Sequence, residues 1–363
     1  MSILTNRRTR TAVHTKEAAL NQRQGAALQG HFTLSALHLY AQLLCAFAFT
    51  LYRHTGTPGY MSVLLAALPL TLFYLLSCRL GKMQGLTDTP WGRCSRAMIA
   101  LCLLTDAQMS LYAFTEIVRE MLPDYNSAVI ALISLLCVLP SLRRQNAHAL
   151  PTLAHLMRWP LAAGMAFCLL GAARQGESGH LFPLLGQDVR RIFTGALFLC
   201  SCLSAAVTPL FLHRPPENLQ QKRKGLASLL FSLLAAALTA FLSAWLLPHY
   251  FLAQPDTVGS LLLIPLRFNP SLPAFSLLVC CMLMLLLISL ACALSRSRHL
   301  FSLAIGRPVS LFAGLLLVPL PALSTDAARQ VLSALAPLRS LLLLAALLLL
   351  LPAAKKKKEA RPE

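Results

Sequence analysis

Charged residues are scarce in this sequence of 363 residues, and acidic residues are the scarcest. Only 12% of the residues are charged, and the chain contains 13 Asp and Glu against 32 Lys and Arg. Soluble domains average about 25% charged residues, so this composition argues against a soluble fold. Hydrophobic residues make up 56% of the chain, and the mean hydropathy is +0.64. Runs of roughly 20 apolar residues recur along the whole length, which predicts an all-α integral membrane protein.

Motifs of soluble enzymes are also absent. The sequence has no Walker loop, no GxSxG, no HExxH and no CxxC pair. The 11 cysteines fall mostly inside the apolar runs, where we expect them to pack as small apolar residues. The sequence therefore gives no support to nucleotide binding, metal binding, redox chemistry or nucleophilic catalysis. We predict that the protein is not an enzyme and has no cofactor.

The net charge of +19 does not by itself indicate nucleic acid as a partner. Lys and Arg lie almost wholly in the short connections between apolar runs, where the positive-inside rule places them. Residues 1–30 are basic and polar and have no apolar core, which predicts a cytoplasmic tail and not a cleaved signal peptide. Residues 354–363 contain four consecutive lysines and predict a second cytoplasmic tail, which suits contact with membrane lipid. A polytopic membrane domain, 31–353, lies between the tails.

Ten apolar runs are candidate transmembrane helices. They are 34–52, 60–80, 97–121, 126–142, 155–173, 192–212, 226–247, 274–295, 309–324 and 336–352. If both termini are cytoplasmic, only eight of the 32 Lys and Arg fall in outer segments, namely Arg53, Arg119, Arg174, Arg190, Arg191, Arg267, Arg329 and Arg339. Because this bias alternates in phase along most of the chain, we predict ten spans with both ends inside.

The third run carries a carboxylate near its middle. With 1.5 Å per residue, Asp106 lies about 14 Å into a hydrocarbon core of about 30 Å. Glu116 lies about 29 Å in by the same measure, where we expect it to be solvated beside Arg119. An ionisable residue at mid-membrane is costly and usually marks a functional pathway, so Asp106 is the informative residue.

The first and sixth runs bring polar groups to the same depth as Asp106. His38 and Gln42 lie on one face of the first helix, and Ser201 and Ser204 lie one turn apart in the sixth. The candidate substrate-binding residues are His38, Gln42, Asp106, Ser201 and Ser204, which would line a small polar cavity. The alternatives are helix packing for the serines, packing or snorkelling for His38, and an interhelical hydrogen bond for Asp106.

Three stretches resemble a known family in their order and spacing. The first is "FTLSALHLY" followed by "GTPGYMSVLLAALPL", the second is "FTEIVREMLPDYNSAVIALISLL", and the third is "GHLFPLLGQDVRRIFTGAL". Together they resemble the endospore germination permease family, the membrane B subunits of nutrient germinant receptors. That family belongs to the amino acid–polyamine–organocation superfamily, so the resemblance implies two inverted five-helix repeats of the leucine-transporter type. The glycines of the family in its first and sixth spans are replaced here by "LLCAFAFTLYRHTG" and "LCSCLSAA".

The resemblance implies a membrane subunit of a spore germinant receptor, located in the spore inner membrane or the cell membrane. Such a subunit would sense a small nutrient such as an amino acid in mid-membrane and signal germination through partner subunits of the receptor. Two alternatives stay open. One is a proton-coupled amino acid transporter with Asp106 as the coupling carboxylate, and the other is a docking subunit that binds no solute.

Overall fold

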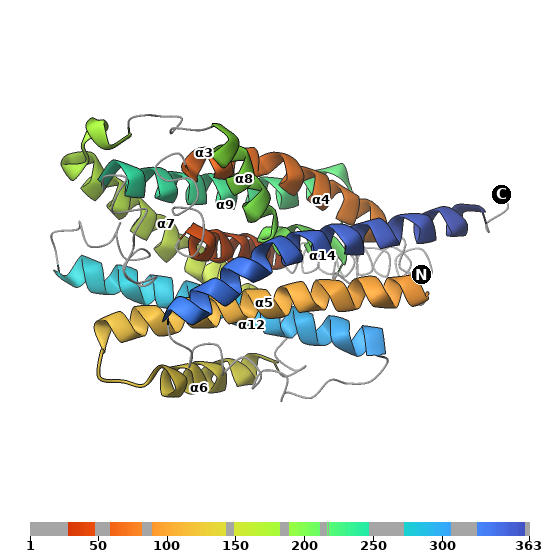
Figure 1. Cartoon of the computed structure of the whole chain (residues 1–363), viewed down its shortest axis with the longest axis horizontal. Helices are drawn as coiled ribbons and strands as arrows, with labels where there is room; N and C mark the ends of the chain where they lie inside the picture. The colour runs from red at the N-terminus through yellow and green to blue at the C-terminus, as the bar shows by residue number, and fades with distance from the viewer. Residues whose placement is uncertain are drawn as a thin grey trace, which may run out of the picture.

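The computed structural model describes residues 28–47, 59–81, 89–142, 149–181, 189–210, 216, 218–246, 272–305 and 325–359. Within these ranges all regular structure is helical and there is no strand. The prediction of an all-α fold is therefore confirmed. Most helices run roughly along the long axis of the molecule, as Figure 1 shows.

The helices follow the apolar runs of the sequence. A helix at 28–47, called the first helix below, precedes the labelled elements. These are α3 (Gly59–Leu65), α4 (Ala67–Gly81), α5 (Pro90–Met121), α6 (Ser127–Val138), η3 (Leu139–Leu142), α7 (Ala149–Gln175), η5 (Ser178–Leu181), α8 (Val189–Cys200), η6 (Leu203–Leu210), α9 (Leu219–Leu246), α12 (Leu272–Ile305) and α14 (Thr325–Glu359). Each predicted span overlaps helix in its described residues except 309–324, which lies wholly outside them. The count of ten spans and the two inverted repeats stay predictions.

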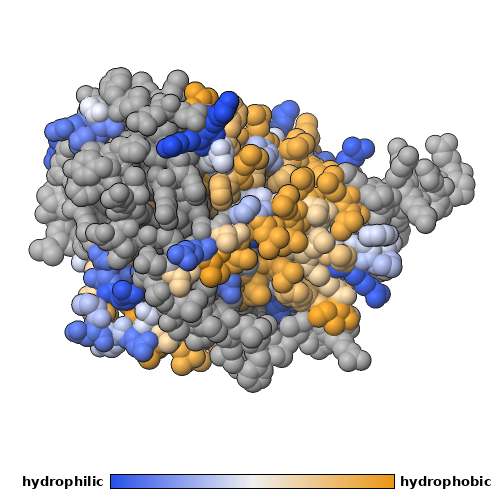
Figure 2. All heavy atoms as spheres, viewed as in Figure 1, coloured by the Kyte–Doolittle hydropathy of each residue, from blue (hydrophilic) through white to orange (hydrophobic). Residues whose placement is uncertain are grey.

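The lengths and surfaces of these helices are those of a membrane protein. Among the described residues, four helices are long and apolar enough to cross a membrane, namely Gly59–Leu80, Pro90–Met121, Leu219–Leu246 and Leu278–Ile305. Large apolar side chains are exposed on them, for example Leu68 at 75% and Phe231 at 68%. Figure 2 shows a broad apolar area with hydrophilic residues toward its edges. A soluble monomer rarely exposes apolar area on this scale, whereas lipid covers it.

Local sequence signals fix the ends of α5, the helix that carries Asp106. Thr89 caps its N-terminus, because the Thr89 hydroxyl accepts a hydrogen bond of 3.1 Å from the Gly92 amide. Pro90 follows at the first helical position, where its fixed φ suits a helix. At the other end Pro123 disfavours helix for the residue before it, and Asn126 caps α6. The result is a helix of 32 residues, longer than a bilayer core needs.

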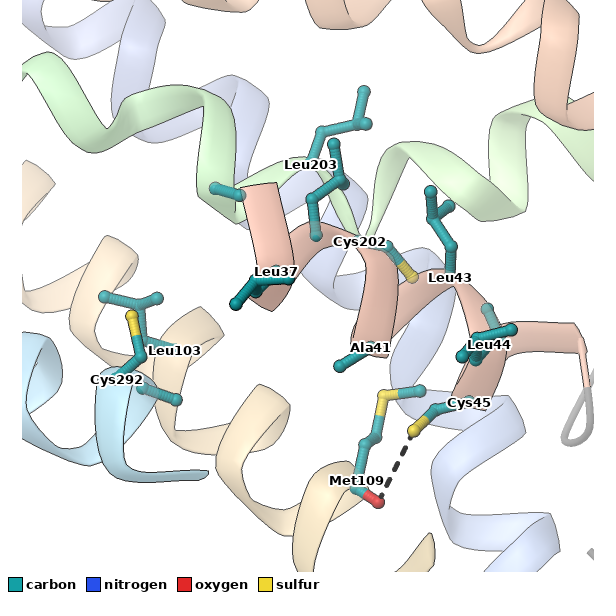
Figure 3. Packing of buried hydrophobic residues seen from close by; sticks show 14 of the residues in the cluster. Leu37, Ala41, Leu43, Leu44, Cys45, Leu103, Met109, Cys202, Leu203 and Cys292 are labelled. Atoms are coloured by element: carbon teal, nitrogen blue, oxygen red, sulfur yellow. Dashed lines mark hydrogen bonds between the residues drawn. The ribbon is translucent and has the colours of Figure 1, made fainter. Parts of the chain in front are cut away.

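The first helix lies inside the bundle. In Figure 1, α3, α4, α8 and α9 lie on one side of the molecule, and α5, α6 and α12 lie on the other. Figure 3 shows the first helix between Leu203 of η6 and Met109 of α5. Its residues Leu39, Leu43 and Cys45 are fully buried. A helix that is apolar on nearly all sides is expected in the core, and its polar residues Ser35, His38 and Gln42 are buried in protein.

The core packs closely where α9 meets the first helix and α4. At Gly225 an added Cβ would overlap the Tyr74 hydroxyl and lie 2.7 Å from Cε1 of Phe32. Only a residue without a side chain permits this approach. Gly225 therefore fixes the distance between three helices.

The sixth predicted span, 192–212, is a broken helix. Its first half, α8, ends at Cys200, and the 3₁₀-helix η6 begins at Leu203. At the break, the amide of Ser201 donates to the carbonyl of Phe198 at 3.1 Å, and the next amide along the chain bonds in the same i→i−3 pattern. This change of pattern places backbone groups of the sixth span in the protein interior, at the level of Asp106.

The last helix is longer than the predicted span 336–352. α14 has 35 residues and begins at Thr325. It continues through 354–359, which were predicted to belong to the cytoplasmic tail. Residues 1–27 of the predicted N-terminal tail lie outside the described residues. The early start of α14 carries Arg339 into the bundle, with consequences for the candidate site.

Candidate functional site

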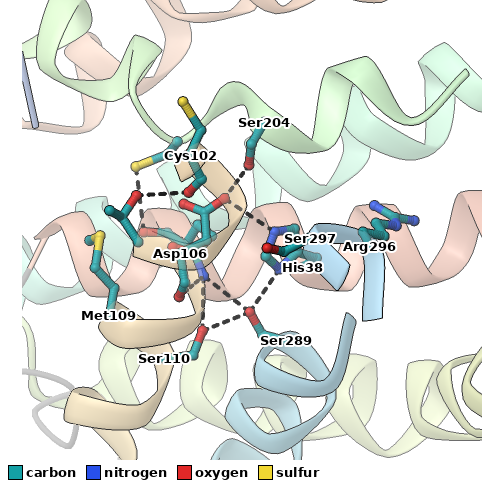
Figure 4. Close-up of polar contacts among 12 residues, drawn as sticks. His38, Cys102, Asp106, Met109, Ser110, Ser204, Ser289, Arg296 and Ser297 are labelled. Carbon is teal, nitrogen blue, oxygen red and sulfur yellow. Dashed lines mark hydrogen bonds and ion pairs between the residues drawn. The ribbon is translucent and has the colours of Figure 1, made fainter. Parts of the chain in front are cut away.

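Asp106 lies at the middle of α5 and has no exposed surface. Its two carboxylate oxygens contact side chains from three other parts of the chain. The Ser204 hydroxyl of η6 donates to Oδ2, and Nη2 of Arg339 in α14 donates to Oδ1. Nε2 of His38 in the first helix lies 3.5 Å from Oδ2. Figure 4 shows Asp106 among His38, Ser204, Ser110 and Ser289.

The structure contradicts the sequence prediction that Arg339 lies in an outer segment. The charge count placed it in an outer segment, but the structure buries it in α14 with only 2% of its surface exposed. Nη2 also donates to the carbonyl of Ser201 at 2.9 Å, and Nη1 donates to Sδ of Met109 at 2.6 Å. A buried charge is tolerated when it is paired and hydrogen-bonded. The carboxylate of Asp106 supplies the pairing, which explains how both charges fit inside an apolar bundle.

A second set of hydrogen bonds links the first helix to α5 and α12. Nε2 of Gln42 donates to the Ser110 hydroxyl at 2.9 Å, to the Ser289 hydroxyl at 3.1 Å and to the carbonyl of Asp106 at 3.1 Å. The Ser110 and Ser289 hydroxyls lie 2.8 Å apart, and Ser289 also shares a bond of 2.8 Å with Nδ1 of His38. Ser289 therefore joins both polar residues of the first helix. Below, the term polar centre means His38, Gln42, Asp106, Ser110, Ser204, Ser289 and Arg339.

Three buried polar atoms of the polar centre lack a hydrogen-bond partner among the residues that the structure describes. They are Nε2 of His38, Oε1 of Gln42 and Nε of Arg339. Each of these residues contacts Asp106, either at its carboxylate or at its carbonyl. Leaving a buried donor or acceptor unsatisfied costs about 1–3 kcal/mol, so three together at one place are unusual. The atoms include a donor, an acceptor and a ring nitrogen that can serve as either.

The structure brings the predicted site residues together, although their role in binding substrate stays a prediction. His38, Gln42 and Ser204 all contact Asp106. Gln42 and Ser204 were expected at the depth of Asp106. Ser201 joins through its backbone carbonyl, while its hydroxyl contacts the neighbouring sulfur of Cys202 at 3.7 Å.

Glu116 requires a correction. It was expected to be solvated at the outer end of α5, but the residue is only 4% exposed. Its Oε1 lies 3.4 Å from Nη1 of Arg119, whose side chain is 42% exposed. This second pair is thus half-exposed, unlike the pair of Asp106 with Arg339. Glu116 therefore provides a matched comparison on the same helix.

The polar centre does not resemble a metal site. Over the described ranges no cluster of three or more His, Cys, Asp and Glu side chains could hold a metal ion. The one carboxylate present is already paired with a guanidinium, whose positive charge opposes a second cation. What the arrangement offers chemically is a fixed pair of opposite charges beside neutral hydrogen-bonding groups.

Comparisons with known proteins support the fold. No protein family and no curated protein sequence matches the chain. The structure is similar to crystal structures of a manganese transporter from Eremococcus coleocola. A histidine-to-alanine mutant of that transporter matches with a TM-score of 0.56 at 13% identity, covering 90% of this chain and 78% of the transporter. Its complex with an aromatic bis-isothiourea compound matches with a TM-score of 0.55 at 14% identity and the same coverage.

At this level of identity the similarity establishes the fold and not the substrate. The neighbours are membrane transporters. The chain is thus a membrane protein with a transporter-like fold.

Proposed function

We propose that the protein binds a small polar solute of the amino acid type at the polar centre. The observation that carries the proposal is the set of three unpartnered atoms on His38, Gln42 and Arg339 around Asp106. A zwitterion has both a cationic donor and an anionic acceptor group, so it can complement an acid and a guanidinium together. In transporters of this fold the site lies near mid-membrane beside broken helices, and here the break at Ser201 adjoins Arg339.

We further propose that the bound solute acts as a signal and is read by partner subunits of a germinant receptor. Support comes from the resemblance of the three stretches to the germination permease family and from the shared fold. The polar centre joins the first helix, α5, η6, α12 and α14. A solute that separates these contacts would shift the packing of five elements at once, which a partner subunit can detect.

Solute binding is tested by thermal unfolding of the purified protein in detergent with a panel of amino acids. A ligand at 100 times its Kd stabilises the folded state by about 2.7 kcal/mol, so a binder raises the melting temperature. Asp106→Asn removes one charge-assisted contact worth about 1.5–3 kcal/mol. It should weaken binding about tenfold or more. Glu116→Gln, on the same helix, should bind as the wild type does.

The outcome separates binding from docking. If no amino acid shifts the wild-type melting temperature, the solute-binding proposal is wrong and the docking subunit is favoured. If a shift occurs but Asp106→Asn retains it in full, the protein binds solutes elsewhere.

A proton-coupled transporter is the second candidate. The favouring observation is the distance of 3.5 Å between Nε2 of His38 and Oδ2 of Asp106, since this geometry allows the two groups to exchange a proton. Uptake of a labelled amino acid into proteoliposomes under a pH gradient distinguishes the two functions. A transporter accumulates the amino acid, whereas a sensor binds it without uptake.

A further inference from the structure

Arg339 occupies a set of acceptors that suits a bound cation. Its guanidinium contacts a carboxylate oxygen of Asp106, the backbone carbonyl of Ser201 and the thioether sulfur of Met109. All three groups carry negative or partial negative charge, and two of them come from α5. With 2% of the residue exposed, Arg339 is held inside the bundle and is not a surface side chain that has folded inward.

The backbone carbonyl of Ser201 indicates which kind of ligand these acceptors suit. Ser201 follows the last residue of α8, so its carbonyl lies at the C-terminal end of a half-helix, where the helix dipole is negative. In broken-helix transporters, carbonyls at such ends coordinate the coupling cation. Here the group at that carbonyl is a side chain of the protein, at 2.9 Å.

We propose that Arg339 is a tethered cation that occupies the coupling-ion position of the fold. The positive charge that a transporter of this type takes from solution is supplied permanently by α14. The protein therefore requires neither a monovalent nor a divalent cation to assemble its polar centre. This inference concerns the cation and not the solute. Its test contains no amino acid, so its failure can be distinguished from a failure of amino acid binding.

The absence of a metal cluster in the described residues agrees with this assignment. A manganese ion at this place would have to displace the guanidinium from Asp106, which is the only carboxylate of the polar centre. The fold is shared with a manganese transporter, but at 13% identity the shared fold does not imply a shared cation site.

A purely structural ion pair would also be buried and would also be destabilised by mutation. A filled cation site and a structural ion pair differ in how the Arg339→Ala variant responds to added cations. If Arg339 fills a cation site, a free cation of suitable size must restore stability when the side chain is removed. A structural pair embedded in close packing gains nothing from added ions.

The experiment measures the melting temperature of wild type and Arg339→Ala in chloride salts at constant ionic strength. Guanidinium at millimolar concentration, sodium and manganese are the probes, and tetramethylammonium is the bulky control. The melting temperature of the wild type should be the same in all of these salts. Arg339→Ala should melt lower and recover at least half of the loss, saturably, with guanidinium or one of the metal ions. The double variant Asp106→Asn/Arg339→Ala should show no recovery.

Two results would overturn the proposal. One is an Arg339→Ala variant that no probe stabilises beyond tetramethylammonium, or whose recovery persists without the Asp106 carboxylate. The other is a wild type whose melting temperature rises saturably with sodium or manganese. Should Arg339→Ala fail to fold, Arg339→Lys keeps a cation on the same helix. Arg339→Lys should fold, and its melting temperature, like that of the wild type, should not depend on the added cation. A melting temperature of wild type or Arg339→Lys that rises with an added cation contradicts the inference.

Discussion

The pair of Asp106 with Arg339 gives the sharpest quantitative prediction. Replacing Arg339 by Met keeps an unbranched, flexible side chain but leaves the buried Asp106 carboxylate without its cation. Breaking a buried ion pair on one side costs about 3–5 kcal/mol of unfolding free energy. Coulomb's law gives a similar figure, since unit charges about 4 Å apart attract by about 4 kcal/mol at an effective dielectric constant of about 20. Asp106→Asn should cost a comparable amount, because it strands the guanidinium.

The double variant Asp106→Asn/Arg339→Met should be much more stable than the two single losses predict when summed. Removing both charges also removes both desolvation penalties, and such replacements are often neutral or stabilising. A double-mutant cycle by equilibrium unfolding in mixed micelles should therefore give a coupling of about 3 kcal/mol or more. The cycle of Glu116→Gln with Arg119→Met on the same helix is the control. Because that pair is half-exposed, its coupling should stay within about 0–1 kcal/mol.

A coupling at the Asp106 pair no larger than that of the control pair would refute the reasoning. It would mean that the two charges do not depend on each other for burial. The assignment of Arg339 as the counter-ion of Asp106 would then fail, even if each single variant were unstable.

Three further predictions test packing, the polar network and orientation. Gly225→Ala should lower stability by about 1–3 kcal/mol, because its Cβ overlaps a buried tyrosine hydroxyl, whereas Gly179→Ala, with no atom within 4 Å of the added Cβ, should be near neutral in the same melting assay. Ser289→Ala should cost about 1–3 kcal/mol, because it removes the partner of Nδ1 of His38 and one bond each from Gln42 and Ser110, and Ser134→Ala, whose hydroxyl donates to the carbonyl of Ile130 within α6, should cost less. In a variant that retains only Cys94, which is exposed near the start of α5, a membrane-impermeant thiol reagent should label the protein from the cytoplasmic face. Labelling only from the outer face would contradict the predicted orientation.

The sequence predicted the polar residues that stand out against an apolar background. Asp106 is a carboxylate in the middle of an apolar run, and His38 and Gln42 share one helical face, with Gln42 near mid-depth. Their positions along the helices predicted similar levels in the membrane, and the structure shows His38 and Gln42 in contact with Asp106. Helical spacing thus located much of the polar centre without any knowledge of how the helices pack.

Arg339 and Ser289 were missed for different physical reasons. Arg339 lies only three residues inside the predicted span 336–352, where a cation is usually interfacial, and it was counted with the outer charges. Its depth became visible only because α14 begins at Thr325 and carries it into the bundle. A signal was nevertheless present, since a carboxylate at mid-membrane needs a counter-charge. Ser289 is a single hydroxyl in a long apolar run, and a lone serine is common at helix contacts.

The absence of glycine from "LCSCLSAA", where the sixth span breaks, is explained by the way the helix breaks. A break through a left-handed residue favours glycine, which "LCSCLSAA" does not contain. The break observed here proceeds through i→i−3 hydrogen bonds into the 3₁₀-helix η6, and 3₁₀ dihedrals lie in the ordinary right-handed region. Serine and cysteine can adopt that geometry without strain. The freed carbonyl of Ser201 then needs a donor in a dry interior, and Arg339 supplies it. A helix break without glycine and a buried arginine at its free carbonyl are therefore compatible parts of one arrangement, in which the protein itself supplies a donor to the carbonyl that the break exposes.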